Sequence, residues 1–367
     1  MSIEHTSVNV ILFFVLYGGA AAVAIVFCLY LLFRRGNAIA PDITPPILLR
    51  RWAAAFFAIA ALGHLWWLIF LILSGDNHSA GFIICAVLDC VSLLTTISGT
   101  LLAMLQDRRR RQWPFIAAMT PIVILGGLQI AWPDINFMTP IAVYFLLLYV
   151  LFTVYMIHAV RQYGRWLHDN YADLEHKEVW MSLTLLTMIL LVLIIYGYMP
   201  DDTSFFLIRI LNFVLFGFLL WRVETLPQLE VVPMGQENGT TQKSQAIPSN
   251  IEQMLASHCV DTKLYLQHDL TLQQLAQTVG TNRLYLSRYF SRQGITYNTY
   301  INDLRINHFI SRYLEAVAAG QPVVAQQLAS DSGYRSYSTF SLAFKQRTGQ
   351  SVTVWMREMT MKISPRR

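Results

Sequence analysis

The sequence predicts an all-α protein with an N-terminal seven-helix transmembrane bundle and a C-terminal all-α domain, in which a linker helix joins two helix-turn-helix units. Three observations support this prediction. Hydrophobic residues make up 55% of the 367 positions, and charged residues make up only 13%. Apolar runs long enough to cross a bilayer are confined to residues 1–222. From residue 249 onward the apolar residues recur at helical spacing, and one motif occurs twice.

Seven apolar segments in the first 222 residues are long enough for transmembrane helices, because a helix needs about 20 mostly apolar residues to cross the hydrocarbon core. These segments are residues 8–33, 52–73, 80–105, 113–132, 137–160, 179–198 and 204–222. The first segment has no basic residues before it and is too long for the apolar part of a signal peptide. We therefore expect it to be retained.

The positions of Lys and Arg predict the orientation of these helices. Three connections on one side hold 11 cations, whereas the N-terminal tail and the loops at 74–79, 133–136 and 199–203 hold none. The cations are Arg34, Arg35, Arg50, Arg51, Arg108, Arg109, Arg110, Arg111, Arg161, Arg165 and Lys177. Because cytoplasmic loops carry the excess of Lys and Arg, the N-terminus is expected outside and the C-terminus in the cytoplasm.

A linker is expected between the two parts of the chain. Residues 223–248 mix Pro, Gly, Gln, Thr and Ser with little apolar periodicity, which is typical of a flexible or partly extended segment. The expected domains are therefore residues 1–222 and residues 249–367. From Ser249 onward 13 Lys and Arg face 7 Asp and Glu, a net charge of +6, whereas the rest of the chain has 14 against 15. A basic domain suits a polyanionic partner.

The first helix-turn-helix is predicted from residues that begin and end helices. Thr271 is a plausible N-cap for one short helix, Gly280 can adopt the positive φ of a turn, and Asn282 can cap the next helix. Leu286 and Phe290 stand four residues apart, so they face the same way, and we expect them to point inward.

The motif then occurs a second time. Leu275, Ala276 and Gly280 recur 53 residues later as Leu328, Ala329 and Gly333, and Asn282, Ser287 and Phe290 recur 54 later as Ser336, Ser341 and Phe344. The segment between the copies reads as one long helix. Two such units on a rigid spacer can address major-groove segments one DNA turn, about 34 Å, apart.

These residues resemble the C-terminal DNA-binding domain of AraC/XylS-type transcriptional regulators, over roughly residues 250–360. The resemblance rests on LA…VG.N..YLSR.F in the first unit, on LA…GY.S.STFS..FK…G.S in the second, and on LRI at 304–306. The family usually has Ala where Phe309 stands, and often Arg where Leu342 stands. Family members often bind as dimers, and the family is bacterial.

The resemblance implies which residues meet DNA. The groove-facing candidates are Leu284, Ser287 and Arg288 in the first unit, and Tyr337, Ser338, Thr339 and Leu342 in the second. Arg288 can reach both guanine acceptors, O6 and N7, although a phosphate contact or a solvated surface role is the alternative. The candidates for phosphate contacts are Arg283, Arg335, Lys345 and Arg347.

Three ionisable residues lie inside predicted spans, where burial of charge is costly. His64, Asp89 and Arg209 all fall in the outer half of their helices. They could form a ligand-binding pocket, or Asp89 and Arg209 could form a structural ion pair, or the three positions could be unrelated.

Together these features predict a membrane-bound, sequence-specific transcriptional regulator whose transmembrane helices sense an external or membrane signal. Its expected location is the bacterial inner membrane, and its expected partners are promoter DNA, the lipid bilayer, an unidentified signal ligand and a second copy in a homodimer. The alternative is a transporter-like or anchor protein whose helix-turn-helix tail binds other proteins. No HExxH motif, paired catalytic carboxylates or Ser/His/Asp set is evident, so we expect no enzyme, no cofactor and no metal site.

Overall fold

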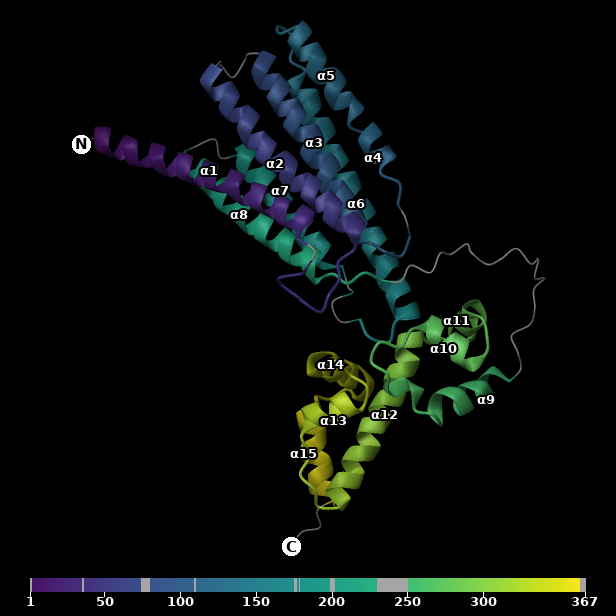
Figure 1. Ribbon diagram of the computed structural model, residues 1–367. Coiled ribbons are helices and arrows are strands. Elements are labelled where there is room, and N and C mark those ends of the chain that lie inside the picture. The colour runs from purple at the N-terminus through teal and green to yellow at the C-terminus, as the bar shows by residue number, and fades with distance from the viewer. Residues whose placement is uncertain are drawn as a thin grey trace, which may run out of the picture. The chain divides into compact units, whose positions relative to one another are not determined.

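The computed structural model describes residues 2–34, 36–73, 80–108, 110–174, 177, 179–198, 202–229 and 250–363 (Figure 1). Within its helices, the side chains at 2–10, 71, 73, 190–191, 193–198, 202–206 and 363 are not described. These residues form helices joined by short connections, and no strand occurs among them. The predicted all-α fold class is therefore confirmed for the described part of the chain.

The chain divides into two compact units. The first unit comprises Met1–Tyr163 and Val179–Met234, and the second comprises Gly164–Glu178 and Gly235–Arg367. The segment Gly164–Glu178, which the sequence presents as an inner loop of the membrane bundle, thus belongs to the C-terminal unit.

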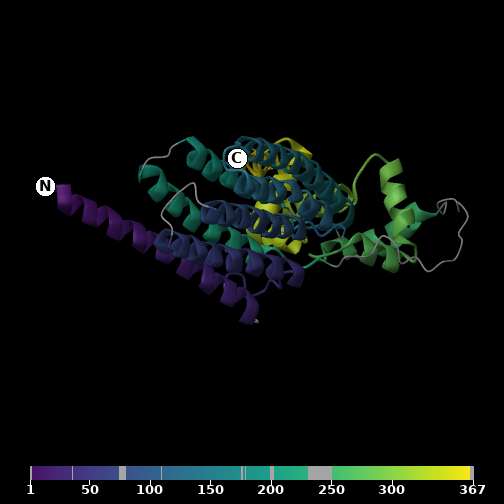
Figure 2. The same cartoon turned by 90° about the horizontal axis from the view of Figure 1, so that it is seen from above.

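The first unit consists of helices that match the predicted spans in position (Figures 1 and 2). These are α1 (Ser2–Phe33), α2 (Ile47–Leu73), α3 (Ala80–Ala103), α4 (Trp113–Ala117), α5 (Thr120–Ala131), α6 (Met138–Asn170), α7 (Met181–Tyr198) and α8 (Asp202–Thr225). Among the described residues, five segments are long and apolar enough to cross a membrane, namely 11–33, 47–70, 80–103, 113–131 and 138–170. The predicted sixth and seventh spans coincide with α7 and α8, but both helices include side chains that are not described, so the seven-pass topology stays a prediction.

The predicted span at 113–132 is not one uninterrupted helix. It consists of α4 and α5, which Ala118 and Met119 separate. Each of the two helices has a proline in its first turn, Pro114 in α4 and Pro121 in α5. A proline has no N–H group for an intrahelical hydrogen bond and its ring crowds the preceding turn, so it ends one helix and begins the next.

A buried carboxylate joins three parts of the first unit near the ends of α1 and α8. Glu224 is fully buried, and its Oε2 atom accepts a hydrogen bond of 3.0 Å from the Tyr30 hydroxyl. Its Oε1 atom lies 3.6 Å from Nε of Arg50 at the start of α2. The Asn37 amide donates to the Glu224 carbonyl at 2.6 Å, which ties the connection between α1 and α2 to α8. A buried charge requires such partners, and these hold the end of α1, the start of α2 and the end of α8 together.

The expected linker begins later than the sequence indicated. Residues 223–225 complete α8, and Leu226 and Leu229 are buried. The Gln106 side chain donates to the Pro227 carbonyl at 2.9 Å and accepts from the Leu229 amide at 2.8 Å. These bonds hold residues 226–229 against the end of α3. The remainder of the expected linker, 230–248, lies outside the described residues.

The second unit contains the C-terminal helices in the predicted order. They are α9 (Ile251–Leu255), a π-helical turn (Ala256–Val260), a 3₁₀ turn (Leu264–Leu266), α10 (Leu272–Val279), α11 (Arg283–Arg292), α12 (Tyr297–Ala318), α13 (Ala325–Asp331), α14 (Tyr337–Thr348) and α15 (Val352–Ile363). Figure 1 shows α12 as the long helix with α10 and α11 at one end and α13 to α15 at the other.

Helix α12 contributes to two separate hydrophobic cores. Its Ile301 packs with Leu286 and Phe290 in the first core, which includes α10 and α11. Its Phe309 lies at the centre of the second core, with its ring centroid 4.5 Å from that of Phe340. The large side chain at 309, where the family usually has Ala, therefore fills space between α12 and α14. One continuous helix thus sets the separation of the two cores.

Gly333 provides the first test of this packing. Its φ is +90°, and a Cβ atom there would lie 2.9 Å from backbone atoms of Leu266. We expect Gly333→Ala to destabilise the second unit by about 2 kcal/mol or more, from backbone strain and overlap together. Gly320→Ala is the matched control, because φ is +66° there but no atom lies within 4 Å. Thermal unfolding of both full-length variants in lipid nanodiscs gives the comparison, and equal unfolding midpoints would contradict the expected overlap.

Candidate nucleic-acid interface and a cavity in the first unit

The first helix-turn-helix is formed by α10 and α11, and local hydrogen bonds fix both ends of its turn. Thr271 and Gln274 make a reciprocal capping box at the start of α10, and Gly280 has a φ of +74°. The Asn282 side chain accepts a hydrogen bond of 2.6 Å from the Leu284 amide and caps α11. The predicted caps and the predicted turn are confirmed. Each cap satisfies an N–H group that the helix leaves unpaired.

The second helix-turn-helix, α13 and α14, repeats this design with different residues. Gly333 again supplies the positive φ, and the Ser336 hydroxyl accepts from the Thr339 amide at 3.3 Å to cap α14. Phe340 and Phe344 are fully buried, as are Leu286 and Phe290 in the first helix-turn-helix. Because these pairs are buried, the opposite faces of α11 and α14 are exposed to solvent.

The candidates for base contacts differ in how accessible they are. On α11, Leu284 is 42% exposed and Arg288 is exposed, whereas Ser287 is half-buried. On α14, Leu342 is 61% exposed and Ser338 is exposed. Both recognition helices thus present an outward leucine and one outward polar side chain to a partner.

The remaining two candidates, Tyr337 and Thr339, are already engaged within the domain. The Tyr337 ring packs against Phe340 with centroids 5.8 Å apart. The Thr339 hydroxyl lies 3.0 Å from the Ser336 hydroxyl at the cap of α14. Both side chains are half-buried and support the start of this helix.

Three of the four candidates for phosphate contacts are held by partners inside the second unit. Arg335 Nη2 lies 2.7 Å from Asp269, and Arg347 Nε lies 2.8 Å from Asp303. Arg283 is hydrogen-bonded to Asn170. Lys345 is exposed. The two ion pairs are solvent-exposed and are each worth about 0–1 kcal/mol, so a DNA phosphate could replace either carboxylate.

Arg305, in the LRI sequence of α12, joins the two helix-turn-helix units and is only 1% exposed. Its Nε donates to the Tyr265 carbonyl at 2.7 Å, and its Nη2 donates to the carbonyls of Gln267 at 2.7 Å and His268 at 3.3 Å. Its guanidinium also lies over the ring of Tyr334, 5.5 Å from the centroid. Burial lowers the pKa of this guanidinium from its ordinary value. The loop before α10 and the turn after α13 are thereby held by one side chain.

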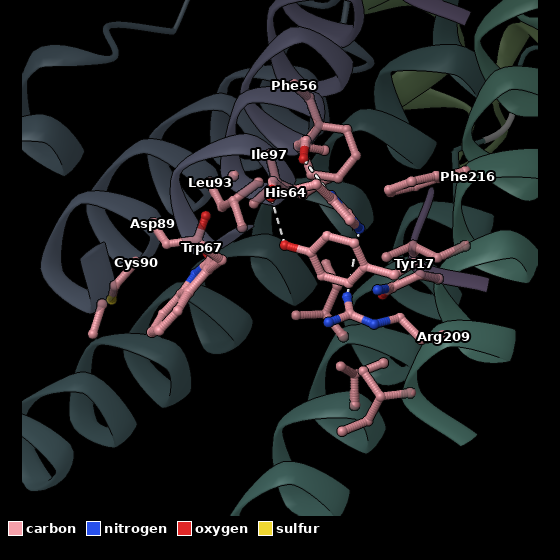
Figure 3. Close-up of a pocket in the computed structure, with 18 of the residues that line it drawn as sticks. Tyr17, Phe56, His64, Trp67, Asp89, Cys90, Leu93, Ile97, Arg209 and Phe216 are labelled. Carbon is pink, nitrogen blue, oxygen red and sulfur yellow. Dashed lines mark hydrogen bonds between the residues drawn. The ribbon is translucent and has the colours of Figure 1, made fainter. Parts of the chain in front are cut away.

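The first unit contains a partly open cavity of about 730 Å³ lined mainly by apolar and aromatic side chains (Figure 3). His64 from α2, Asp89 from α3 and Arg209 from α8 all line it. The structure therefore brings together the three ionisable residues that the sequence singled out within its spans. Tyr17 of α1, Trp67 of α2 and Asn212 of α8 also contribute polar groups to the wall.

Hydrogen bonds around His64 define which of its ring nitrogens carries the proton. His64 Nδ1 lies 2.7 Å from the Ala60 carbonyl, so this nitrogen carries the proton, because a carbonyl oxygen can only accept. His64 Nε2 is then free to accept a hydrogen bond from Arg209 Nη1 at 3.4 Å. The guanidinium also lies over the Tyr17 ring at 4.6 Å, and the Tyr17 hydroxyl donates to the His64 carbonyl at 2.6 Å. Histidine, arginine and tyrosine thus form one connected group.

Asp89 stands on the cavity wall with half of its carboxylate unpaired. Its Oδ2 atom accepts a hydrogen bond of 3.3 Å from the Trp67 indole, whereas its buried Oδ1 atom has no hydrogen-bond partner. A Cβ atom at Gly63 would lie 2.7 Å from this Oδ1 atom, so the carboxylate rests directly on the backbone of α2. A buried unpaired carboxylate oxygen is costly and favours a hydrogen-bond donor from a ligand.

The sequence did not reveal the contributions of Tyr17, Trp67 and Asn170. Tyr17 and Trp67 lie in apolar spans where aromatic residues are common, and only helix packing brings them to His64, Asp89 and Arg209. Asn170 lies more than 110 positions before its partner Arg283. No spacing rule connects residues that far apart.

Comparison with known proteins identifies the class of the second unit. Residues 275–358, from within α10 to within α15, match a family model described as a helix-turn-helix domain. This confirms the resemblance of the C-terminal region to AraC-type helix-turn-helix domains. No curated protein and no solved structure matches the chain. The matched domain is of a DNA-binding, regulatory class.

Arg305 is expected to be essential for the stability of the second unit. Arg305→Met leaves three backbone carbonyls without their donor, and each orphaned buried group costs roughly 1–3 kcal/mol. Arg312→Met is the control, because Arg312 lies on the same helix, is exposed and forms a surface ion pair with Glu315. Limited proteolysis of full-length protein in nanodiscs should cleave the second unit readily in the first variant but not in the second. Equal protease resistance would show that Arg305 is dispensable.

Proposed function

We propose that the protein is a membrane-bound transcriptional regulator that reads two adjacent major-groove segments with α11 and α14. The observation that carries this proposal is the pair of capped recognition helices on one linker helix, each with its buried aromatic inward and an exposed leucine outward. The exposed arginine of α11 and the net charge of +6 from residue 249 onward add attraction to DNA. These features also weigh against a tail that only binds protein.

The membrane placement follows from composition and charge. Five segments of the first unit are long and apolar enough to cross a bilayer, and the sequence gathers 11 cations in or next to alternate connections between the predicted spans. We propose that these connections face the cytoplasm of a bacterium and that seven helices cross its inner membrane. Residues 249–367 then occupy the compartment that holds the DNA.

The cavity of the first unit supports a sensory role for the membrane helices. Among the described residues, no ion pair joins Asp89 to Arg209, because Asp89 is bonded to Trp67 and Arg209 contacts His64 and Tyr17. A structural ion pair is therefore the weaker of the alternatives. The apolar wall and the unpaired Asp89 oxygen suit an amphipathic molecule with an apolar body and one hydroxyl or amine donor.

Genome-wide DNA occupancy of the full-length, membrane-inserted protein tests the regulator. We expect a few sharp promoter peaks that disappear in Arg288→Ala, because a bidentate arginine contact contributes about 1–3 kcal/mol of base discrimination. Arg312→Ala, an exposed arginine on α12 away from both recognition helices, should leave the peaks unchanged. Absence of peaks from the inserted protein, with no sequence selected from a random duplex library in vitro, would exclude the regulator.

Variants of the cavity test the sensor. Asp89→Asn or Arg209→Gln should abolish the response of a promoter reporter, while protein level and promoter occupancy remain, because the cavity then loses one of its two charges. Asp134→Asn is the matched control, since Asp134 is exposed outside the cavity. Loss of folded protein in both cavity variants would instead show that the two residues hold the helices together.

A further inference from the structure

The described residues of the segment Gly164–Glu178, here called the docking segment, pack against the first helix-turn-helix. Ala172 is 2% exposed and belongs to the same core as Leu275 and Leu286. The Ala172 amide donates to the Leu270 carbonyl at 3.3 Å, and Tyr171 forms an antiparallel bridge with Thr271, the N-cap of α10. The chain beyond α6 therefore completes the wall of a domain that begins some 80 residues later in the sequence.

Helix α12 recognises the backbone of the docking segment through Asn298. This side chain is buried, and its Nδ2 atom donates to the carbonyls of Tyr171 at 3.1 Å and Ala172 at 2.8 Å. The Asn298 amide oxygen in turn accepts from Asn302 at 2.9 Å, which fixes the orientation of the amide. A buried amide bonded in this way specifies one position for the docking segment.

The docking segment also holds the first residue of the recognition helix. Arg283 donates from Nε at 3.0 Å and from Nη2 at 2.6 Å to Oδ1 of Asn170, the last residue of α6. The Asn170 Nδ2 atom donates to the Trp166 carbonyl at 2.6 Å, so the amide oxygen is the atom that faces Arg283. Arg283 is half-buried in this position, and burial lowers the pKa of its guanidinium.

The partner of Arg283 is neutral, and this decides what the contact can do. Hydrogen bonds between two ionised groups are stronger than those to a neutral amide, so a DNA phosphate is a better partner than Asn170. Arg283 stands at the start of α11, where a recognition helix meets the DNA backbone through its N-terminus. The amide therefore holds the cation in place without neutralising its charge.

We propose that the docking segment regulates DNA binding, because Asn170 and a DNA phosphate compete for Arg283. This inference rests on the proposed function. Helix α6 supplies Phe145 to the cavity of the first unit and Asn170 to the docking segment. Because one helix carries both residues, a ligand that shifted α6 relative to α11 would change whether Arg283 is available to DNA.

Binding of a 30-base-pair random DNA duplex to full-length protein in lipid nanodiscs, measured from 50 to 200 mM salt, tests the competition. Asn170→Ala should release Arg283 and raise the affinity. One added phosphate contact makes the slope of log affinity against log salt concentration steeper by about 0.9. The gain in affinity of Asn170→Ala over the wild type should therefore shrink about 3.5-fold between 50 and 200 mM salt. Arg283→Ala should remove the gain when it is combined with Asn170→Ala.

Asn170→Asp separates competition from unfolding. A carboxylate holds Arg283 more strongly than an amide does, so this variant should bind the duplex more weakly than the wild type. Damage to the fold would change the affinity of both Asn170 variants in the same direction, whereas competition changes them in opposite directions. Affinities of both variants that equal the wild type, or that shift together, would overturn the proposal.

Lys345→Ala, which removes an exposed candidate for a phosphate contact, distinguishes failure of this inference from failure of the proposed function. If Lys345→Ala weakens binding of the duplex but neither Asn170 variant shifts it, then only the competition at Arg283 is wrong. If the wild-type protein and all variants fail to bind the duplex, then the DNA-binding function is wrong and the inference falls with it.

Discussion

The buried guanidinium of Arg305 is the contact on which the arrangement of the two helix-turn-helix units depends. It binds three carbonyls of the loop before α10 and packs on Tyr334 beside the turn of the second helix-turn-helix. Gly333 is required at that turn because Leu266 and Arg305 leave no room for a Cβ atom. Since α12 carries Arg305 between its two cores, the spacing of α11 and α14 is fixed by one helix and one side chain.

Cations of the second unit are held in two different ways, with different consequences for binding. Arg335 and Arg347 pair with carboxylates at the surface, where solvent weakens the attraction. Arg305 and Arg283 are instead bonded to neutral oxygen atoms. The positive charge of Arg283 is thus retained in the domain and can act on a phosphate, whereas Arg305 is enclosed on all sides and has only a structural role.

Two groups of ionisable side chains in the first unit differ in how they are paired. One is the group around Glu224, which joins the end of α1, the start of α2 and the end of α8. The other is the cavity of His64, Asp89 and Arg209. Each of the two carboxylates has one oxygen without a hydrogen-bond partner, but Oε1 of Glu224 lies 3.6 Å from Arg50 Nε. Oδ1 of Asp89 has no ion-pair partner among the described residues and belongs to the wall of a cavity, so Asp89 is the carboxylate that favours a ligand.

The sequence by itself determined the features that depend on neighbouring residues. Apolar runs located the spans, caps such as Thr271 and Asn282 located the helix starts, and the repeated glycines located both turns, because a helix or a turn is decided within a few positions. The break between α4 and α5 also depends on neighbouring residues, because each of the two helices has a proline in its first turn. The apolar run is long enough for one span, so its length alone did not predict the break.

Only the tertiary structure decided which distant residues meet. It placed Tyr17 against Arg209, Asn170 against Arg283, and the docking segment in the C-terminal unit. Pairing across 100 or more positions depends on how helix faces pack, and no periodicity in the chain encodes that choice. For the same reason the four phosphate candidates were equivalent as sequence, and only their folded partners distinguished Arg283 from the others.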